Sequence, residues 1–114
     1  MENLEQFARE RFEFNRQKQT LKEQQTQRLT VTHNGGMFNV DMPLMVWLYQ
    51  QNMHAGLFQG ETKIVLVDIY DTPIKVDIEE LLKLCVERWN EVTNDWYNEY
   101  EELKKKRRVG DVEV

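Results

Sequence analysis

The fold class is decided by residues 62–84, which read TKIVLVDIYDTPIKVDIEELLKL. Residues 62–70 contain the continuous β-branched and apolar run IVLV, which is typical of a strand covered on both faces. Residues 71–73, Asp-Thr-Pro, predict a turn, after which the chain returns as a second strand. Asp77, with Glu80 three residues later, predicts a capping box at the start of a helix. This stretch therefore predicts a β-hairpin that leads directly into a helix.

A second hairpin is predicted by the residues before this stretch. Residues 29–33 alternate between apolar and polar side chains, as a half-buried strand does, and another strand is expected over 37–40. Asn34 and Gly35 lie between them and fit a type I′ turn, because both central residues of that turn adopt positive φ.

A short helix is predicted over residues 42–53. Asp41 fits its N-cap, and Pro43 fits its first turn, where a missing N–H costs nothing. Because this segment is apolar on nearly every side, the helix is expected to be buried.

The two hairpin-plus-helix blocks resemble each other, with four identities at a constant offset of 36 residues. The matching pairs are Val31 and Val67, Val40 and Val76, Asp41 and Asp77, and Leu48 and Leu84. A ββα duplication would produce this pattern. The common preference of hairpin-to-helix junctions for an Asp cap would also produce it, and the sequence leaves both explanations open.

The N-terminal residues 1–28 have the composition of a helix, rich in Glu, Gln, Lys and Arg and without Gly or Pro. Phe7, Phe14 and Leu21 recur every seven positions and form a thin apolar stripe. Such a thin stripe cannot stabilise a long isolated helix. This polar helix or arm is therefore expected to lie against the domain, a second copy or another chain.

The C-terminal helix, predicted from Ile78 to about Arg107, carries the most informative pattern. Leu82, Trp89, Trp96 and Leu103 are spaced by seven, and Ile78, Cys85 and Val92 follow an adjoining line, extended by Tyr97 and Tyr100. About 30 residues make ~45 Å of helix, longer than such a domain is wide, so part of the seam must extend beyond the core. Either a partner covers that part or the N-terminal helix folds back over it. The residues expected at an interface are Phe7, Phe14, Leu21, Trp89, Trp96, Tyr97, Tyr100 and Leu103.

The predicted architecture is therefore α+β, with a long N-terminal helix, two hairpins in one small antiparallel sheet separated by a buried helix, and a long amphipathic C-terminal helix. The domain boundaries predicted from these elements are an N-terminal arm over 1–28, a compact domain over 29–108 and a tail over 109–114.

The composition limits the partners that are expected. The chain has 15 basic and 20 acidic residues, a net charge of −5, which opposes binding to a phosphate backbone and makes nucleic acid an unlikely partner. The single cysteine, Cys85, cannot form an internal disulfide and indicates a reducing compartment. No secretory signal or bilayer-spanning run is recognised, so a soluble protein without membrane contact is expected, either cytoplasmic or incorporated in a particle assembled inside the cell.

Catalytic, cofactor and metal sites are not predicted. His33 and His54 are the only histidines and lack further ligands at metal-binding spacing, and no phosphate-binding or nucleophile-elbow motif is present. Cys85 lies within the apolar stripe and is interpreted as a small core residue.

Two charged features each have two explanations. The run Lys104, Lys105, Lys106, Arg107 and Arg108 would suit a basic patch, or a helix end whose dipole and preceding glutamates it complements. The acidic face formed by Glu87, Glu91, Asp95, Glu99 and Glu102 would suit an imitation of a phosphate row, or a solvated helix face.

The function favoured by these features is that of a non-enzymatic protein-binding or assembly component, a homo-oligomer or a small adaptor subunit. The size, acidity and lack of motifs of this chain are also common among phage accessory and virion proteins. The alternative is an acidic inhibitor that occupies a host enzyme or a nucleic-acid-binding protein through its acidic face.

Overall fold

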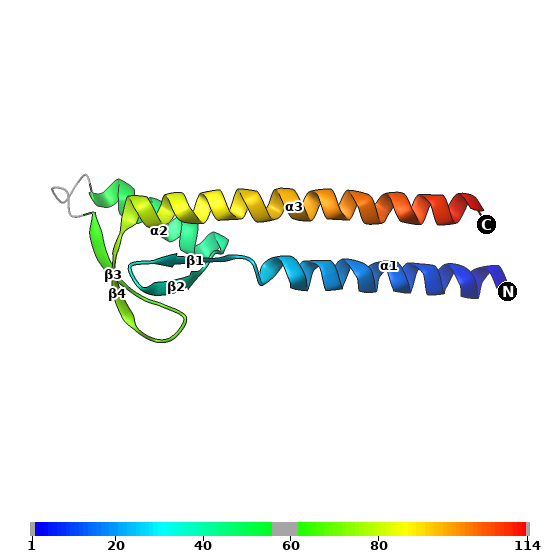
Figure 1. Ribbon diagram of the computed structural model, residues 1–114, viewed down its shortest axis with the longest axis horizontal. Helices are drawn as coiled ribbons and strands as arrows, with labels where there is room; N and C mark the ends of the chain where they lie inside the picture. Colours follow the sequence, from blue (N-terminus) through cyan, green and yellow to red (C-terminus); the bar gives the residue numbers. More distant parts are fainter. Residues whose placement is uncertain (1, 56–61, 114) are drawn as a thin grey trace. The chain divides into compact units, whose positions relative to one another are not determined.

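The computed structural model describes residues 2–55 and 62–113, with side chains for residues 3–55 and 62–106 (Figure 1). Its elements are α1 (Glu2–Thr26), β1 (Thr30–His33), β2 (Gly36–Asn39), α2 (Met42–Ala55), β3 (Lys63–Val67), β4 (Pro73–Asp77) and α3 (Ile78–Glu113). The predicted α+β class, with two hairpins and long terminal helices, is confirmed.

The chain divides into two compact units. The hairpin unit, Leu29–Val92, contains both hairpins, α2 and the first part of α3. The helical unit, Met1–Arg28 with Thr93–Val114, combines α1 with the rest of α3. The sequence placed the long helix up to residue 108 in one compact domain, whereas the structure divides that helix between the two units.

The first hairpin has the predicted type I′ turn. His33 of β1 lies opposite Gly36 of β2, which leaves Asn34 and Gly35 as a two-residue loop. Both loop residues have positive φ, 50° for Asn34 and 83° for Gly35, as this turn requires.

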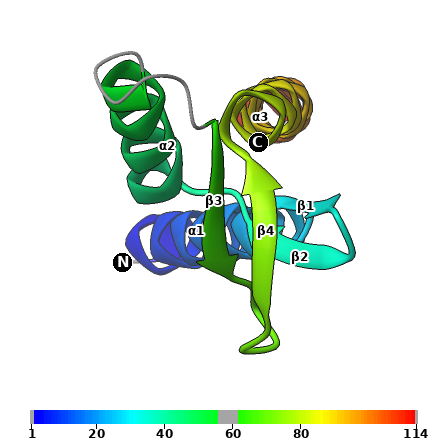
Figure 2. The same cartoon turned by 90° about the vertical axis from the view of Figure 1, so that its left-hand side faces the viewer.

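The two hairpins form separate two-stranded sheets, so the single sheet predicted from the sequence is wrong. Figure 2 shows β1–β2 running across β3–β4 rather than beside it. The approach is close, since a Cβ added to Gly36 would lie 2.7 Å from Cγ1 of Ile74. Near the crossing, the N–H of Ile69 donates to the carbonyl of Met37 at 3.0 Å. Strands that cross face to face bury apolar side chains between them without sharing a hydrogen-bond ladder.

Asp68 fixes the turn of the second hairpin and connects it to β2. Its Oδ1 accepts the N–H groups of Tyr70 and Thr72 at 2.9 and 3.0 Å, and its Oδ2 accepts the N–H of Met37 at 3.1 Å. Burial raises the pKa of Asp68, but hydrogen bonds from Thr72, Met37 and Tyr70 outweigh this and hold the pKa below its ordinary value of 3.8. The carboxylate is therefore ionised at neutral pH.

β3 is covered on one face only, which corrects the prediction of a strand covered on both faces. Ile64 and Leu66 pack against the core, whereas Val65 and Val67 are 62% and 61% exposed. A strand rich in β-branched residues is favoured by its backbone conformation even where one face meets solvent, so its composition did not show how many faces are covered.

α2 begins as predicted, because Oδ1 of Asp41 accepts the N–H of Leu44 at 2.8 Å. The prediction that this helix is buried is wrong. Met45, Leu48 and Ala55 are buried. The exposed large apolar side chains of the helix are Met42, Val46, Trp47, Tyr49 and Met53. A helix that rests on a single core buries only one stripe, whatever the composition of its opposite face.

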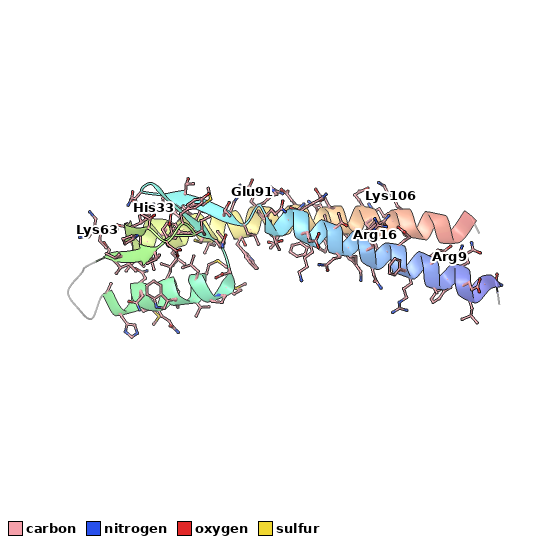
Figure 3. The ribbon with its side chains drawn as sticks, turned by 90° about the horizontal axis from the view of Figure 1, so that it is seen from below. Arg9, Arg16, His33, Lys63, Glu91 and Lys106 are labelled. Atoms are coloured by element: carbon pink, nitrogen blue, oxygen red, sulfur yellow. The ribbon has the colours of Figure 1, made fainter. Side chains whose placement is uncertain are left out.

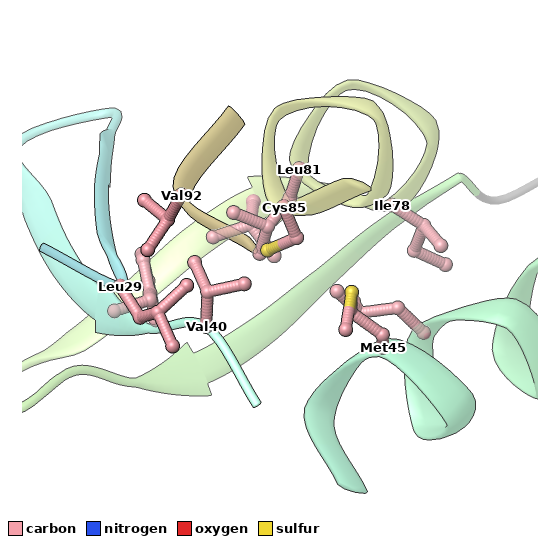
Figure 4. Packing of buried hydrophobic residues seen from close by; sticks show 10 residues of the cluster. Leu29, Val40, Met45, Ile78, Leu81, Cys85 and Val92 are labelled. Carbon is pink, nitrogen blue, oxygen red and sulfur yellow. The ribbon is translucent and has the colours of Figure 1, made fainter. Parts of the chain in front are cut away.

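The hairpin unit has one apolar core (Figure 4). It is built from both hairpins, α2 and the first part of α3. Its buried members are Leu29, Phe38, Val40, Met45, Leu48, Val76, Ile78, Leu81, Cys85 and Val92. Cys85 is fully buried, as the apolar-stripe interpretation requires.

α3 begins with half of the predicted capping box. Oδ1 of Asp77 accepts the N–H of Glu80 at 3.1 Å, but the N–H of Asp77 donates to Nε2 of His33 at 3.3 Å instead of to Glu80. His33 thereby connects the tip of the first hairpin to the start of α3. The helix continues to Glu113, through residues predicted to form a tail.

The similarity between the two blocks extends to element order and to the Asp caps, but not to strand register. Val31 pairs with Phe38, and the 36-residue offset would pair Val67 with Ile74; instead Val67 pairs with Pro73. Leu48 is fully buried, whereas its sequence match Leu84 is 37% exposed.

Candidate interaction surface

The helical unit is a pair of antiparallel helices, in which α1 lies along the part of α3 that begins at Thr93 (Figure 1). Phe14 and Leu21 of α1 are buried, at 9% and 8% exposure. The rings of Phe14 and Tyr100 lie 6.4 Å apart at an angle of 47°. Of the two explanations that the sequence left open, the N-terminal helix therefore folds back over this part of the seam.

Two lysines extend this aromatic contact. The Nζ of Lys18 lies 5.1 Å from the centre of the Phe14 ring, and the Nζ of Lys104 lies 6.0 Å from the centre of the Tyr100 ring. Cations over ring faces add a modest attraction at exposed sites. The stripe on α1 is thus supplemented by the apolar stems and charges of its polar neighbours.

A polar network joins the two helices near the end of α1. Gln25 is only 4% exposed, and its Nε2 donates to Oε2 of Glu99 at 2.8 Å. Its Oε1 accepts from Nη1 of Arg28 at 2.8 Å, and Nη2 of Arg28 donates to Oδ2 of Asp95 at 2.9 Å. Sequence reasoning did not find this network. The only available signal was that Gln25 follows Leu21 by four residues and so lies on the same helix face.

Two open grooves flank Leu21, which lines both of them. One, of about 560 Å³, also includes Leu103 and the charged side chains of Arg16 and Lys106, labelled in Figure 3. The other, of about 540 Å³, includes Trp96 and Tyr100. Two helices form a single layer, so each side of their seam remains open to a further element.

Several apolar side chains of the helical unit are exposed. Leu4, Phe7 and Phe12 on α1 are 74%, 54% and 69% exposed, and Tyr97 on α3 is 63% exposed. Leu4, the exposed Ala8 and Phe12 recur every four residues. Leu4, Phe7, Ala8 and Phe12 are called the N-terminal apolar stripe below.

The eight residues predicted at an interface are thus distributed over four environments. Phe14 and Leu21 are buried between the helices, and Trp96, Tyr100 and Leu103 are partly buried along the same seam. Phe7 and Tyr97 are exposed. Trp89 belongs to the hairpin unit and packs against its core.

The structure bears on one of the two explanations of the basic run, the helix end with preceding glutamates, and confirms only the glutamate contacts. The Nζ of Lys104 lies 3.7 Å from Oε1 of Glu101, one turn earlier, and the Nζ of Lys105 lies 3.8 Å from Oε1 of Glu102. Because α3 continues to Glu113, the run is not in its last turn, and the proposed match to the helix dipole is wrong. The side chains of Arg107 and Arg108 lie outside the described ones.

Most of the acidic face is engaged with neighbouring side chains. Asp95 and Glu99 bind Arg28 and Gln25, and Glu102 lies near Lys105. In the hairpin unit, Glu91 lies 3.4 Å from Arg88, while Glu87 is exposed. Carboxylates held by side chains of their own chain are less available to imitate a free phosphate row.

Two described side chains that could act in catalysis, those of His33 and Cys85, make structural contacts in the hairpin unit. His33 accepts a backbone N–H, and Cys85 lies in the core, where burial and nearby Asp41 raise the pKa of its thiol to about 11. Among the residues that the structure describes, no three His, Cys, Asp or Glu side chains are grouped to hold a metal ion.

Comparison with known proteins gives no match among family models, curated proteins or solved structures. None of the described helices combines the length and apolarity required to cross a bilayer.

Proposed function

We propose that this chain is a non-enzymatic assembly component that binds protein through its helical unit, with a second copy of the chain as its first partner. The observation that carries the proposal is the N-terminal apolar stripe, which leaves two phenylalanines and a leucine more than half exposed on one helix. Single exposed apolar residues are ordinary, but a group of them on one element is typical of a binding surface.

The architecture of the helical unit supports the same conclusion. In a four-helix bundle, two helical pairs pack on each other, so that the side chains along each seam are covered from a further side. Here, two helices bury Phe14 and Leu21 and leave a groove on each side of Leu21. A second helical pair would supply the missing layer.

The test compares the mass of the protein in solution, measured by light scattering, with that of Phe12→Ser. Phe12 is 69% exposed, so its loss should leave the helical content unchanged while the apparent association constant falls about tenfold or more. Met53→Ser, at a similarly exposed apolar residue of α2, is the matched control and should associate like the unchanged protein. Equal association of all three proteins would contradict the proposal.

A further inference from the structure

The two outer edges of the second hairpin differ in how their backbone groups are satisfied. In this antiparallel pair, the N–H of Ile78 donates to Thr62 and the N–H of Asp68 donates to Thr72. These two bonds join even-numbered residues, and directly opposite residues of the ladder alternate between hydrogen-bonded and non-hydrogen-bonded pairs. The N–H and C=O groups of odd-numbered residues in both strands therefore point away from the ladder.

The outer edge of β4 is occupied. The carbonyl of Lys75 accepts from Nδ2 of Asn34 at 3.0 Å, and the N–H of Asp77 donates to Nε2 of His33 at 3.3 Å. The third outward residue, Pro73, has no N–H to offer. Side chains from the tip of the first hairpin and a proline thus close this edge, in the manner by which proteins protect edge strands.

The outer edge of β3 is open. The outward residues are Lys63, Val65 and Val67, and within the described part of the chain their N–H and C=O groups meet no hydrogen-bonding partner. The edge is occupied only beyond the strand, where the N–H of Ile69 donates to Met37. The side chains along the open part are exposed, and two of the three are valines.

The charges at the ends of β3 have opposite signs. Lys63 begins the strand, and Asp68 follows its last residue. At the Asp68 end, the open edge adjoins a groove of about 220 Å³, whose charged lining residues are Asp41 and Asp68, both acidic. Asp68 is ionised at neutral pH because three backbone N–H groups bind its carboxylate.

From this geometry we propose that β3 is a self-recognition edge, which pairs antiparallel with β3 of a second copy about a two-fold axis at Val65. The two hairpins then form one four-stranded sheet across the dimer. Val65 lies opposite Val65 of the second copy, and Lys63 lies opposite Val67 at both ends. Outward N–H and C=O groups of each chain meet those of the other in about six hydrogen bonds.

Charge complementarity selects this orientation. Antiparallel pairing brings Lys63 of each copy opposite Val67 of the other, beside the groove that Asp41 and Asp68 line, and places no like charges opposite each other. Parallel pairing in register would stack Lys63 on Lys63 and would leave the acidic ends together. Pairing Val65 with Val65 also keeps the side chains of Val65 and Val67 from both copies on the same, exposed face of the sheet.

This inference concerns the hairpin unit and does not rest on the function proposed for the helical unit. Both interfaces would be two-fold and would use different surfaces of the same chain. A component with two such interfaces connects copies into assemblies larger than a dimer.

The first experiment is disulfide trapping with Val65→Cys in the full-length chain. Cα atoms of a hydrogen-bonded antiparallel pair lie about 5.5 Å apart, within the range that a disulfide spans. Native Cys85 is fully buried and should stay silent. Val46→Cys, at a valine 51% exposed on α2, is the matched control. We expect Val65→Cys to form the covalent dimer at least tenfold faster than Val46→Cys; equal rates would overturn the proposal.

The second experiment measures self-association of Val65→Lys, which places two like charges opposite each other on the two-fold axis. We expect at least a tenfold loss of association at this interface, with Val46→Lys unaffected. A wild-type chain that remains monomeric at every concentration would overturn the proposal, as would unchanged association of Val65→Lys. Binding only of an unrelated extended peptide at this edge would also overturn it.

The same variants separate this interface from the helical one. Phe12→Ser should reduce the assembly to the dimer held by β3, Val65→Lys should reduce it to the dimer held by the helices, and the double variant should be monomeric. If Phe12→Ser leaves association unchanged while Val65→Lys abolishes it, the function proposed for the helical unit fails and this inference stands.

Discussion

The hairpin unit and the helical unit stabilise themselves in different ways. Ten buried residues form the core of the hairpin unit, contributed by both hairpins and two helices. In the described part of the helical unit, the buried side chains are Phe14, Leu21 and Gln25, one of which is polar. The same chain thus contains a unit with an interior and a unit that is a single layer of two helices.

This difference shows that, in a small chain, the residues that stabilise the fold and the residues free to bind a partner can be different ones. Apolar burial supplies most of the free energy of folding, and in the described residues it lies mainly in the hairpin unit. A helical pair with so little burial depends on propensity, a few ion pairs and the polar network, and these contribute little each. The surfaces proposed for assembly are those that folding leaves uncovered.

The largest expected effect is the fall in the stability of the hairpin unit on Leu48→Ala, which removes a core side chain. Leu48 is fully buried, so the cavity left behind should lower the free energy of unfolding by about 2–5 kcal/mol. Chemical denaturation followed by circular dichroism measures the change. Its control is Leu84→Ala, at the sequence match of Leu48, which is 37% exposed and should lose only about 1 kcal/mol. Equal losses would mean that the two blocks use these leucines alike, against the burial observed.

The next effect tests the crossing of the two hairpins. A Cβ on Gly36 would lie 2.7 Å from Cγ1 of Ile74 and 3.1 Å from Cε2 of Phe38. Gly36→Ala should therefore cost about 1–3 kcal/mol of unfolding free energy, since both neighbours belong to a packed interior. Gly35→Ala is a useful comparison, because nothing lies within 4 Å of its added Cβ and only its positive φ of 83° opposes the change. A Gly36→Ala variant as stable as the unchanged protein would show that the hairpins are less closely packed.

The sequence was informative where a local rule decides the structure. The type I′ turn followed from Asn34 and Gly35, and the helix starts followed from Asp41 and Asp77, since these depend on neighbouring residues alone. It failed where distant segments decide. The crossing of the hairpins, the exposed face of α2 and the diversion of the Asp77 N–H to His33 depend on contacts between elements far apart in sequence.

The candidate surfaces were predictable only in part. Heptad spacing identified Phe14 and Leu21, and Tyr100 extended the seam on the other helix; the structure brings Phe14 and Tyr100 together. The spacing could not show that α1 and α3 cover each other, because a stripe defines a face and not its partner. The open edge of β3 was not predicted, because which edge of the hairpin is closed depends on Asn34 and His33, which reach β4 from the first hairpin.

A smaller effect is expected at the polar network of the helical unit. Gln25→Ala removes the hydrogen bonds to Glu99 and Arg28 and should cost about 1–2 kcal/mol, since Gln25 is almost fully buried. Because the helical unit has little core, the loss should be seen as faster amide exchange in α1 while exchange in the hairpin unit is unchanged. The control is Gln19→Ala, which removes an exposed bond to Glu23 and should have little effect. Uniformly faster exchange in both units would mean that they unfold together and would break the comparison.

The smallest expected effect is confined to acidic pH and concerns the stability of the hairpin unit. The pKa of Asp68 is lowered in the folded protein, so its carboxylate contributes stability above its ordinary value of 3.8. That contribution is lost as the pH falls below 3.8 and through the lowered folded-state pKa. Asp68→Asn should therefore be less stable than the unchanged protein at neutral pH, and the two should converge as the solution is acidified below that value. Thermal unfolding at a series of pH values measures both curves. Parallel curves across that range would show that Met37, Tyr70 and Thr72 bind the amide as well as the carboxylate, and that the connection between the hairpins does not depend on charge.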